Sequence, residues 1–159
     1  SWEAAAQEAE ALGVRACRIR IGIVLGPGGG ALAAMKPAFM LWLGGWLGDG
    51  RQWMSWIHRA DLVALILWLL DGPGRSGAYN ATAPQPATNK EFSKALGASL
   101  HRPALLPMPA PAVRLLVGEM AHLLLTGQKV LPQRALAEGF AFRFPELGAA
   151  LREVWGVAR

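Results

Sequence analysis

The stretch "VRACRIRIGIVLGPGGG", residues 14–30, decides the fold class of this 159-residue chain. Its first part alternates arginine with apolar residues, and its second part, "IGIVL", is almost wholly apolar. Alternation is typical of a strand with one solvent-facing side, whereas a continuous apolar run is typical of a strand buried on both faces of a parallel sheet. We therefore predict one strand over residues 14–25 that enters a parallel sheet and ends in a glycine-rich turn.

Helix-forming and strand-forming segments alternate along the rest of the chain, which indicates the α/β class. A helix should open the chain and end at Gly13. Further helices are predicted over residues 31–43, 61–70, 89–100 and 112–125, from residue 132, and after residue 145 to residue 155. Pro37 should bend the first of these helices or begin a second one. Thr88 or Asn89 should be the N-cap of the helix over residues 89–100. Short strands are predicted over residues 53–57, 77–83 and within 103–111.

The composition, 53% hydrophobic and 17% charged, excludes a disordered chain. The apolar excess predicts that some apolar surface meets a partner, another subunit or a further part of the same protein. Cys17 is the only cysteine, so neither an internal disulfide nor a thiolate zinc site can form, and a reducing compartment fits best. The longest apolar run, residues 62–70, is about half as long as a membrane span requires, so we expect no membrane span.

The net charge of +5 would favour nucleic-acid binding if the basic residues clustered. The densest group is Arg15, Arg18 and Arg20, and strand alternation would place Arg15 on the face opposite to the other two. No nucleic-acid-binding module is recognisable, so we predict no nucleic-acid partner. The arginines fit a solvated basic face, which could receive a phosphorylated ligand.

Residues for catalysis are few. The three histidines, His58, His101 and His122, fall on separate predicted elements, with His101 at a solvent-facing helix end and His122 on an apolar helix. Neither a metal-binding H-E-x-x-H motif nor a G-x-S-x-G elbow occurs, and "GPGGG" is neither a Walker loop nor G-x-G-x-x-G. We therefore predict no metal site and no catalytic residue in this chain.

The segment "GDGRQWMSWIHRAD", residues 48–61, is the other candidate for a site. Alternation along a strand sends Gln52, Trp56 and His58 to one face, and Trp53, Ser55 and Ile57 to the other. The first set mixes apolar bodies with polar tips, so it could form a ligand wall or could pack beneath a helix, and both alternatives stay open. Asp61 is predicted to cap the following helix.

Four motifs carry a family resemblance: "RIGIVLGPGGGALAAM", "GDGRQWMSWIHRADLVALI", "GAYNATAPQPATNKEF" and "GQKVLPQRALAEGFAFRFPELGAAL". In this order and spacing, over residues 2–155, the chain resembles the C-terminal half of the epimerase-family proteins among the extended short-chain dehydrogenase/reductases. The resemblance implies the C-terminal part of an extended Rossmann-type fold. Residues 1–30 would end a Rossmann domain, 31–100 would form a substrate-side α/β region, and 101–159 a helical C-terminal domain of unknown function.

The resemblance also implies a site. Arg20, Gly22 and Ile23 would approach the nicotinamide cofactor. The substrate side would be formed by Gly29, Gly30, Gln52, Trp56 and His58, with the two glycines allowing a close backbone approach. The family's glycine loop and Tyr-x-x-x-Lys pair would precede residue 1, and Tyr79, the only tyrosine, has Ala83 where the lysine would stand.

We therefore expect the substrate-binding portion of an NAD(P)-dependent epimerase or reductase-like protein. It would not be catalytic by itself: it would bind no cofactor alone, and NADP or NAD only with its missing N-terminal Rossmann half. The expected partners are that half, a small-molecule substrate and a second copy of the chain. Ile23 and Met54 replace an asparagine and an arginine found in many sugar-nucleotide epimerases, which favours a non-catalytic interaction module as the alternative. The expected compartment is the cytoplasm, or alternatively an organellar matrix or stroma.

Overall fold

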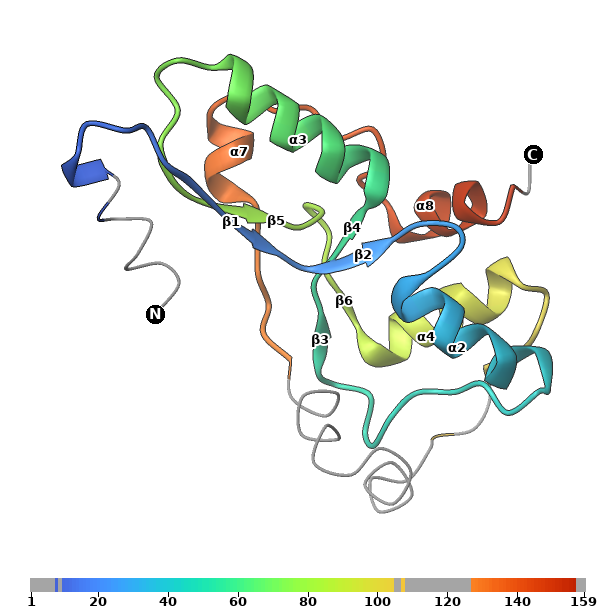
Figure 1. Cartoon of the computed structure of the whole chain (residues 1–159). Helices are drawn as coiled ribbons and strands as arrows, with labels where there is room; N and C mark the ends of the chain where they lie inside the picture. Colours follow the sequence, from blue (N-terminus) through green and yellow to red (C-terminus); the bar gives the residue numbers. More distant parts are fainter. Residues whose placement is uncertain (1–7, 9, 105–106, 108–126, 157–159) are drawn as a thin grey trace.

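The computed structural model describes residues 8, 10–104, 107 and 127–156. Short strands cross the centre of the molecule and helices lie around them (Figure 1), as the alternating sequence pattern predicts. The strands are β1 (Cys17–Ile21), β2 (Ile23–Leu25), β3 (Trp53–Met54), β4 (Trp56–His58), β5 (Gly77–Ala81) and β6 (Ala87–Thr88). The helices are α2 (Gly30–Met40), α3 (Arg59–Asp71), α4 (Asn89–Ser99), α7 (Gln133–Ala137) and α8 (Leu147–Val154).

The strand predicted over residues 14–25 changes its partner at Gly22. Before this glycine β1 pairs in parallel with β5, and after it β2 pairs in parallel with β4. The Gly22 amide donates to the carbonyl of Ala81, and the Ile23 amide donates to the carbonyl of Ser55. The predicted parallel pairing is confirmed, but one uninterrupted strand is wrong, because the segment begins at Cys17 and is divided at Gly22.

Glycine is required at this change of partner because the neighbouring chains approach too closely for a side chain. A Cβ at residue 22 would collide with the carbonyl oxygen of Ser55 and would lie 3.1 Å from Cγ2 of Thr82. The crossing point therefore brings three separate segments, around residues 22, 55 and 82, into direct contact.

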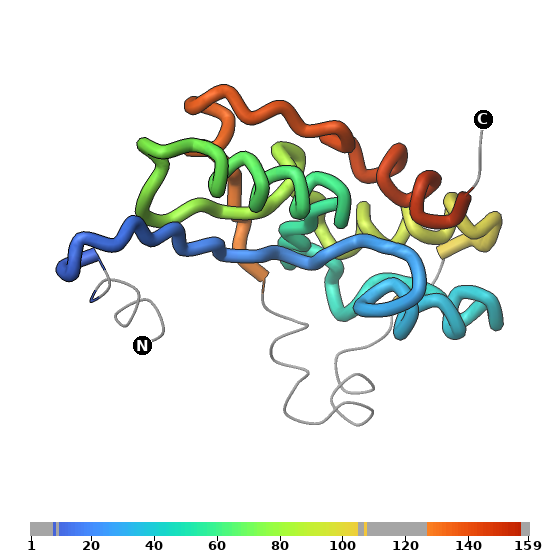
Figure 2. Tube along the Cα trace, turned by 45° about the horizontal axis from the view of Figure 1, so that its top comes forward, coloured from blue at the N-terminus to red at the C-terminus, as the bar shows by residue number. Residues whose placement is uncertain are grey.

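Two hydrophobic clusters hold the strands and helices together. Alternation along β4 places the fully buried Trp56 in the first cluster, with residues of α2, α4 and α8, and the fully buried Ile57 in the second, with residues of α3 and β5. The C-terminal segment runs along α3 on the side away from β1 and β2 (Figure 2), and its Phe140 and Phe142 belong to the second cluster. Since α8 packs against α4, residues from the middle and the end of the chain share one core.

The ends of the helices test the predicted caps. Thr88 caps α4 and forms a capping box with Glu91, which confirms one of the two predicted N-caps. Asp61 is not the N-cap of α3: that position belongs to His58, whose Nδ1 accepts a hydrogen bond from the Ala60 amide. Helix α2 ends at Met40 rather than at residue 43, and it contains Pro37 without a break.

Asp61 is instead a buried anchor in the first turn of α3. Its side chain is 2% exposed, and its two carboxylate oxygens accept hydrogen bonds from the amides of Arg143 (2.8 Å) and Phe144 (2.9 Å). The carboxylate thus ties the segment before α8 to the start of α3. No spacing in the sequence connects residue 61 to residues more than eighty positions away.

Part of the apolar sequence lies at the surface. Leu25 is fully buried, but Ile21 is 54% exposed, so burial of "IGIVL" on both faces is wrong at its first residue. On α3, Val63, Leu67 and Leu70 are also at least half exposed. In the part of the chain that the structure describes, no helix combines the length and the apolar character needed to cross a membrane. The predicted helix over residues 112–125, His122 and most of the segment 103–111 lie outside the described residues.

Candidate functional site

A cavity of about 550 Å³ opens where the long strand changes its partner. Its walls come from the end of β1, the connection between β3 and β4, the end of β5 and the loop before α7. We call it the polar hollow; it is lined by Arg20, Ile21, Gly22, Ser55, Asn80, Thr82, Gln128, Lys129, Val130, Leu131 and Gln133.

Three polar side chains fix the loop that forms one wall of the polar hollow. Ser55 Oγ donates to the Gln128 carbonyl (2.8 Å) and accepts from the Val130 amide (3.0 Å). Asn80 Nδ2 donates to the Leu131 carbonyl (3.1 Å), and Thr82 Oγ1 donates to the Val130 carbonyl (3.3 Å). The wall is therefore held by its backbone, which leaves the side chains at 128 and 129 exposed on the loop.

The charge of the polar hollow is positive. Arg20 and Lys129 line it, two glutamines add amide groups, and no carboxylate is among its lining residues. Lys129 also lies over the ring of Trp53, with Nζ 4.6 Å from the ring centroid. Such a lining suits a ligand that carries hydroxyl, carbonyl or anionic groups. Among the described residues, no group of three or more metal-binding side chains converges.

Two of the eight residues predicted from the resemblance line the polar hollow, namely Arg20 and Gly22. Ile23 is half-buried and packs against the first hydrophobic cluster. Gly30 begins α2 with φ of +66°, and Gly29 precedes it in exposed backbone. A separate cavity of about 440 Å³ near this loop is lined by Gly26, Gly28, Ala33, Lys36, Pro37, Met40 and Trp155.

The other three predicted residues bind groups within the protein. Gln52 Nε2 donates to the Leu47 carbonyl (3.1 Å), and the indole of Trp56 donates to the Gln85 carbonyl (3.0 Å). His58 is 3% exposed, and both of its ring nitrogens are engaged: Nδ1 caps α3, and Nε2 lies 2.8 Å from Oε2 of Glu153. Its ring also packs on that of Phe144, with centroids 4.1 Å apart. Ligand contact by these residues stays a prediction.

Ser55, Asn80 and Thr82 were not among the predicted site residues. The alternation along residues 52–58 correctly separates Ser55 from Trp56, but the polar hollow lies on the side of Ser55. Asn80 and Thr82 stand two positions apart in "GAYNATA", a polar alternation that could have identified the face they share. The loop 127–131 that they bind offers no such periodic signal.

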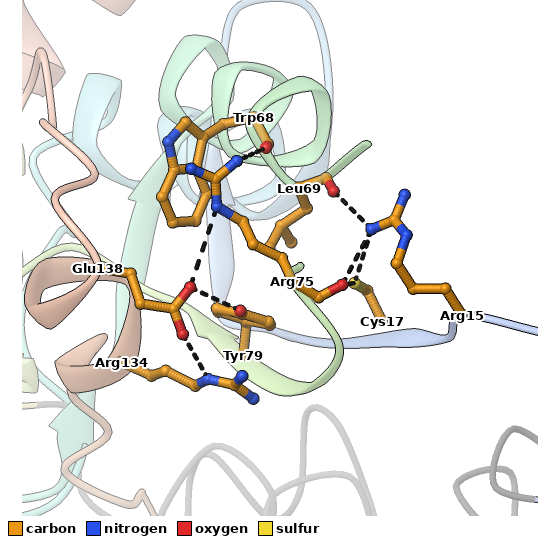
Figure 3. A network of polar contacts seen from close by, with 8 residues as sticks. All are labelled: Arg15, Cys17, Trp68, Leu69, Arg75, Tyr79, Arg134 and Glu138. Carbon is orange, nitrogen blue, oxygen red and sulfur yellow. Dashed lines mark hydrogen bonds and ion pairs between the residues drawn. The ribbon is translucent and has the colours of Figure 1, made fainter. Parts of the chain in front are cut away.

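A polar network joins the second cluster to α7 (Figure 3). The hydroxyl of Tyr79 donates to Glu138 Oε2 (2.8 Å), and Arg134 Nε donates to Glu138 Oε1 (2.8 Å). These two hydrogen bonds lower the pKa of Glu138, while burial and the same bond to Glu138 raise the pKa of Tyr79. The network anchors α7 beside β5 and so positions the loop that precedes α7.

Comparison with known proteins gives one matching family model and several relatives. Residues 108–154 match the family described as a domain of unknown function, DUF1731. "Epimerase family protein SDR39U1" of Mus musculus is 47% identical over 154 residues, covering 96% of this chain and 52% of the relative. "Epimerase family protein SDR39U1 homolog, chloroplastic" of Arabidopsis thaliana is 48% identical over 153 residues, covering 96% of this chain and 44% of the relative.

A solved structure agrees with these relatives. The human epimerase family protein SDR39U1 (isoform 2), crystallised with NADPH, superimposes with a TM-score of 0.85 at 44% identity. The match covers 91% of this chain and 50% of the human one. The chain thus spans about half the length of the relatives that it matches.

Proposed function

We propose that this chain belongs to the epimerase-family proteins of the extended short-chain dehydrogenase/reductases, because it is 47% identical to one of them over 52% of that relative's length. In this proposal it forms the substrate-binding portion of an NAD(P)-dependent epimerase or reductase-like protein. In this proposal the chain is not catalytic by itself. It acts together with a dinucleotide-binding half, and the hydride chemistry belongs to the nicotinamide.

The observation that carries the proposal is the polar hollow at the change of strand partner. The switch at Gly22 places Arg20 beside Ser55 and Asn80, and it leaves a cavity of a size suited to a small molecule. A cationic side chain, hydroxyls and amides around one hollow can orient a substrate with hydroxyl or carbonyl groups. Residues 128–131 of the loop form one side of the polar hollow.

In this proposal the nicotinamide would lie at the edge of the polar hollow beside Arg20, which offers a positive charge there. The space beside Gly22 is filled by Ser55 and Thr82, so the absence of a side chain at Gly22 serves the crossing of the strands. When bound, the nicotinamide would accept or deliver a hydride; this chain would hold the substrate against it. The glycine loop for the diphosphate would come from the other half, as the family resemblance implies.

Exposed apolar residues support contact with such a half. Val63, Leu67 and Leu70 are 50%, 54% and 63% exposed, and their spacing places them along one side of α3. Ile21, at the end of β1, is exposed to a similar degree. An apolar stripe on a helix, together with an apolar strand end, is typical of surfaces that another structural layer covers.

A hybrid protein tests the proposal. The chain would replace the matching half of the human relative, and NADPH binding would be measured by calorimetry on the hybrid, on the chain alone and on the human protein. We expect stoichiometric NADPH binding by the hybrid and none by the chain alone.

Two results would contradict the proposal. Tight stoichiometric NADPH binding by the chain alone would show that no second half is needed. A folded hybrid that binds no NADPH would favour the non-catalytic interaction module.

In a hybrid that binds NADPH, Ser55→Ala should weaken binding of a small substrate without changing NADPH affinity, because the Ser55 side chain fixes only the wall of the polar hollow. The compartment, which is the cytoplasm or alternatively an organellar matrix or stroma, stays part of the proposal.

A further inference from the structure

A second cavity, of about 530 Å³, lies at the beginning of β1 and β5, whereas the polar hollow lies at their ends. We call it the basic pocket; it is lined by Glu10, Gly13, Val14, Arg15, Ala16, Arg18, Pro73, Gly74, Ser76, Gly77 and Arg134. Three arginines and one carboxylate, that of Glu10, are among the lining residues, and Arg134 also pairs with Glu138, which is not one of them. We propose that the basic pocket binds the phosphate group of a small molecule between Arg18 and Arg134.

Arg18 lacks the hydrogen-bond acceptors that a buried guanidinium needs. Its side chain is 16% exposed, and among the described residues its Nε and Nη1 have no hydrogen-bond partner. The nearest carboxylate oxygen, Oε2 of Glu10, lies 3.6 Å from Nη1, which is an ion pair without a hydrogen bond. Because burying a charged donor without a hydrogen-bond acceptor is costly, an oxyanion in the pocket would stabilise this arginine.

The guanidinium group of Arg134 lies beside Gly77, as that of Arg18 does. Its Nε donates to Glu138 and its guanidinium lies over the ring of Tyr79, 4.3 Å from the centroid, so the side chain is held in one orientation (Figure 3). Arg134 Nη1 and Arg18 Nη2 lie 2.9 and 3.9 Å from the position that a Cβ at Gly77 would occupy. The two guanidinium groups therefore converge beside a residue that has no side chain.

Arg15 has a different role in the basic pocket. Its Nη1 donates to the carbonyls of Leu69 (2.9 Å) and Arg75 (3.0 Å) (Figure 3). Its Nη2 donates to the carbonyl of Leu70 (3.0 Å). The bonds to Leu69 and Leu70 satisfy carbonyls at the end of α3, where a positive charge is favourable. Arg15 thus shapes the pocket and adds charge, while Arg18 and Arg134 remain to hold the ligand. The expected separation of Arg15 from Arg18 is wrong, because Arg15 precedes the first residue of β1 and is not subject to its alternation.

A phosphate group fits these donors better than a single carboxylate does. Planar guanidinium groups bind phosphate through paired hydrogen bonds, and a phosphate has enough oxygens to accept from two arginines at once. The volume of the pocket leaves room for the rest of a small molecule. Glu10 is the competing anion, so binding should displace its weak ion pair with Arg18. The proposal depends on no nicotinamide and no second half.

The test uses the whole 159-residue chain, titrated with inorganic phosphate, pyrophosphate and citrate at constant ionic strength and followed by NMR. We expect phosphate and pyrophosphate to shift the amide signals of Ser76 and Gly77, with citrate binding more weakly. Arg18→Gln and Arg134→Gln should each weaken phosphate binding about ten-fold or more, the value of one hydrogen bond between charged groups. Arg152→Gln, an exposed arginine of α8 outside the pocket, is the matched control and should change the affinity less than about two-fold.

Glu10→Gln separates ligand binding from a purely structural role of Arg18. Removing the competing carboxylate should tighten phosphate binding about two- to five-fold, and this surface substitution keeps the test valid if Arg18→Gln fails to fold. The proposal is overturned if phosphate does not bind, if Arg152→Gln weakens binding as much as the pocket variants, if Glu10→Gln brings no gain, or if citrate binds as tightly as phosphate.

Discussion

Replacing Asp61 should destabilise the chain more than replacing any other acidic residue on α3. In Asp61→Ala the amides of Arg143 and Phe144 both lose a charged acceptor, and the first turn of α3 loses a favourable negative charge. A hydrogen bond to a charged group contributes about 1.5 to 3 kcal/mol, so for two such bonds we expect a loss of about 3 to 6 kcal/mol in the free energy of unfolding. Asp61→Asn keeps one acceptor oxygen, so we expect a loss of about 1.5 to 3 kcal/mol.

The assay is urea denaturation followed by tryptophan fluorescence, with the free energy taken from the midpoint and the slope. Asp71→Asn is the matched control, because Asp71 is the exposed last residue of the same helix and should change the stability by no more than about 0.5 kcal/mol. Hydrogen exchange at residues 143 and 144 should become faster in Asp61→Asn, since these amides lose protection first.

The reasoning is refuted if Asp61→Ala costs less than about 1 kcal/mol, because unpaired amides in a buried site cannot be that cheap. It is refuted equally if Asp71→Asn costs as much as Asp61→Asn. A confirmed loss would also matter for the predicted site, because Asp61 holds Phe144 in place and Phe144 packs on His58.

Two further predictions concern the strand switch and the α7 network. Gly22→Ala should destabilise the chain by at least about 1 to 3 kcal/mol, because the new Cβ meets the Ser55 backbone. Gly74→Ala is the control and should change the stability little, because the space around Gly74 is open. Equal urea midpoints for the two variants would contradict this prediction. Glu138 has a pKa lowered from its ordinary value of 4.5, so the stability it contributes is present above that value and is lost as the pH falls through the lower pKa of the folded state. Glu138→Gln should therefore lose less stability than the unaltered chain between about pH 5 and pH 3, and parallel acid profiles of the urea midpoint would disprove the assignment.

Local sequence signals predicted most of the elements. The capping box at Thr88 and Glu91, the run of helix formers after it and the period-two pattern in β4 each depend on residues a few positions apart, and the structure contains all three. The signals failed where a distant segment decides the outcome. Asp61 has the spacing of an N-cap, but amides at residues 143 and 144 compete for its carboxylate and hold it.

The candidate site also combines residues that the sequence predicted with residues that only the tertiary structure identifies. Arg20 and Gly22 were predicted from the family resemblance and line the polar hollow. Ser55 and Asn80 were not predicted, and their role depends on hydrogen bonds to the distant loop 127–131. His58 was equally suited by sequence to a ligand or to packing. Glu153, almost a hundred positions later, occupies its second nitrogen in the fold.

The sequence by itself determined that this is an α/β chain, where most of its described strands and helices lie, and which family it resembles, because hydrophobic period, capping residues and glycine turns are local properties. It did not predict β6 or the division of the first strand at Gly22. Only the tertiary structure decided that the long strand changes its partner at Gly22, that Arg18 converges with Arg134, and that the polar hollow faces Ser55. These features arise from contacts between residues far apart in the chain, and no local pattern records which distant backbone will fill the space beside a given side chain.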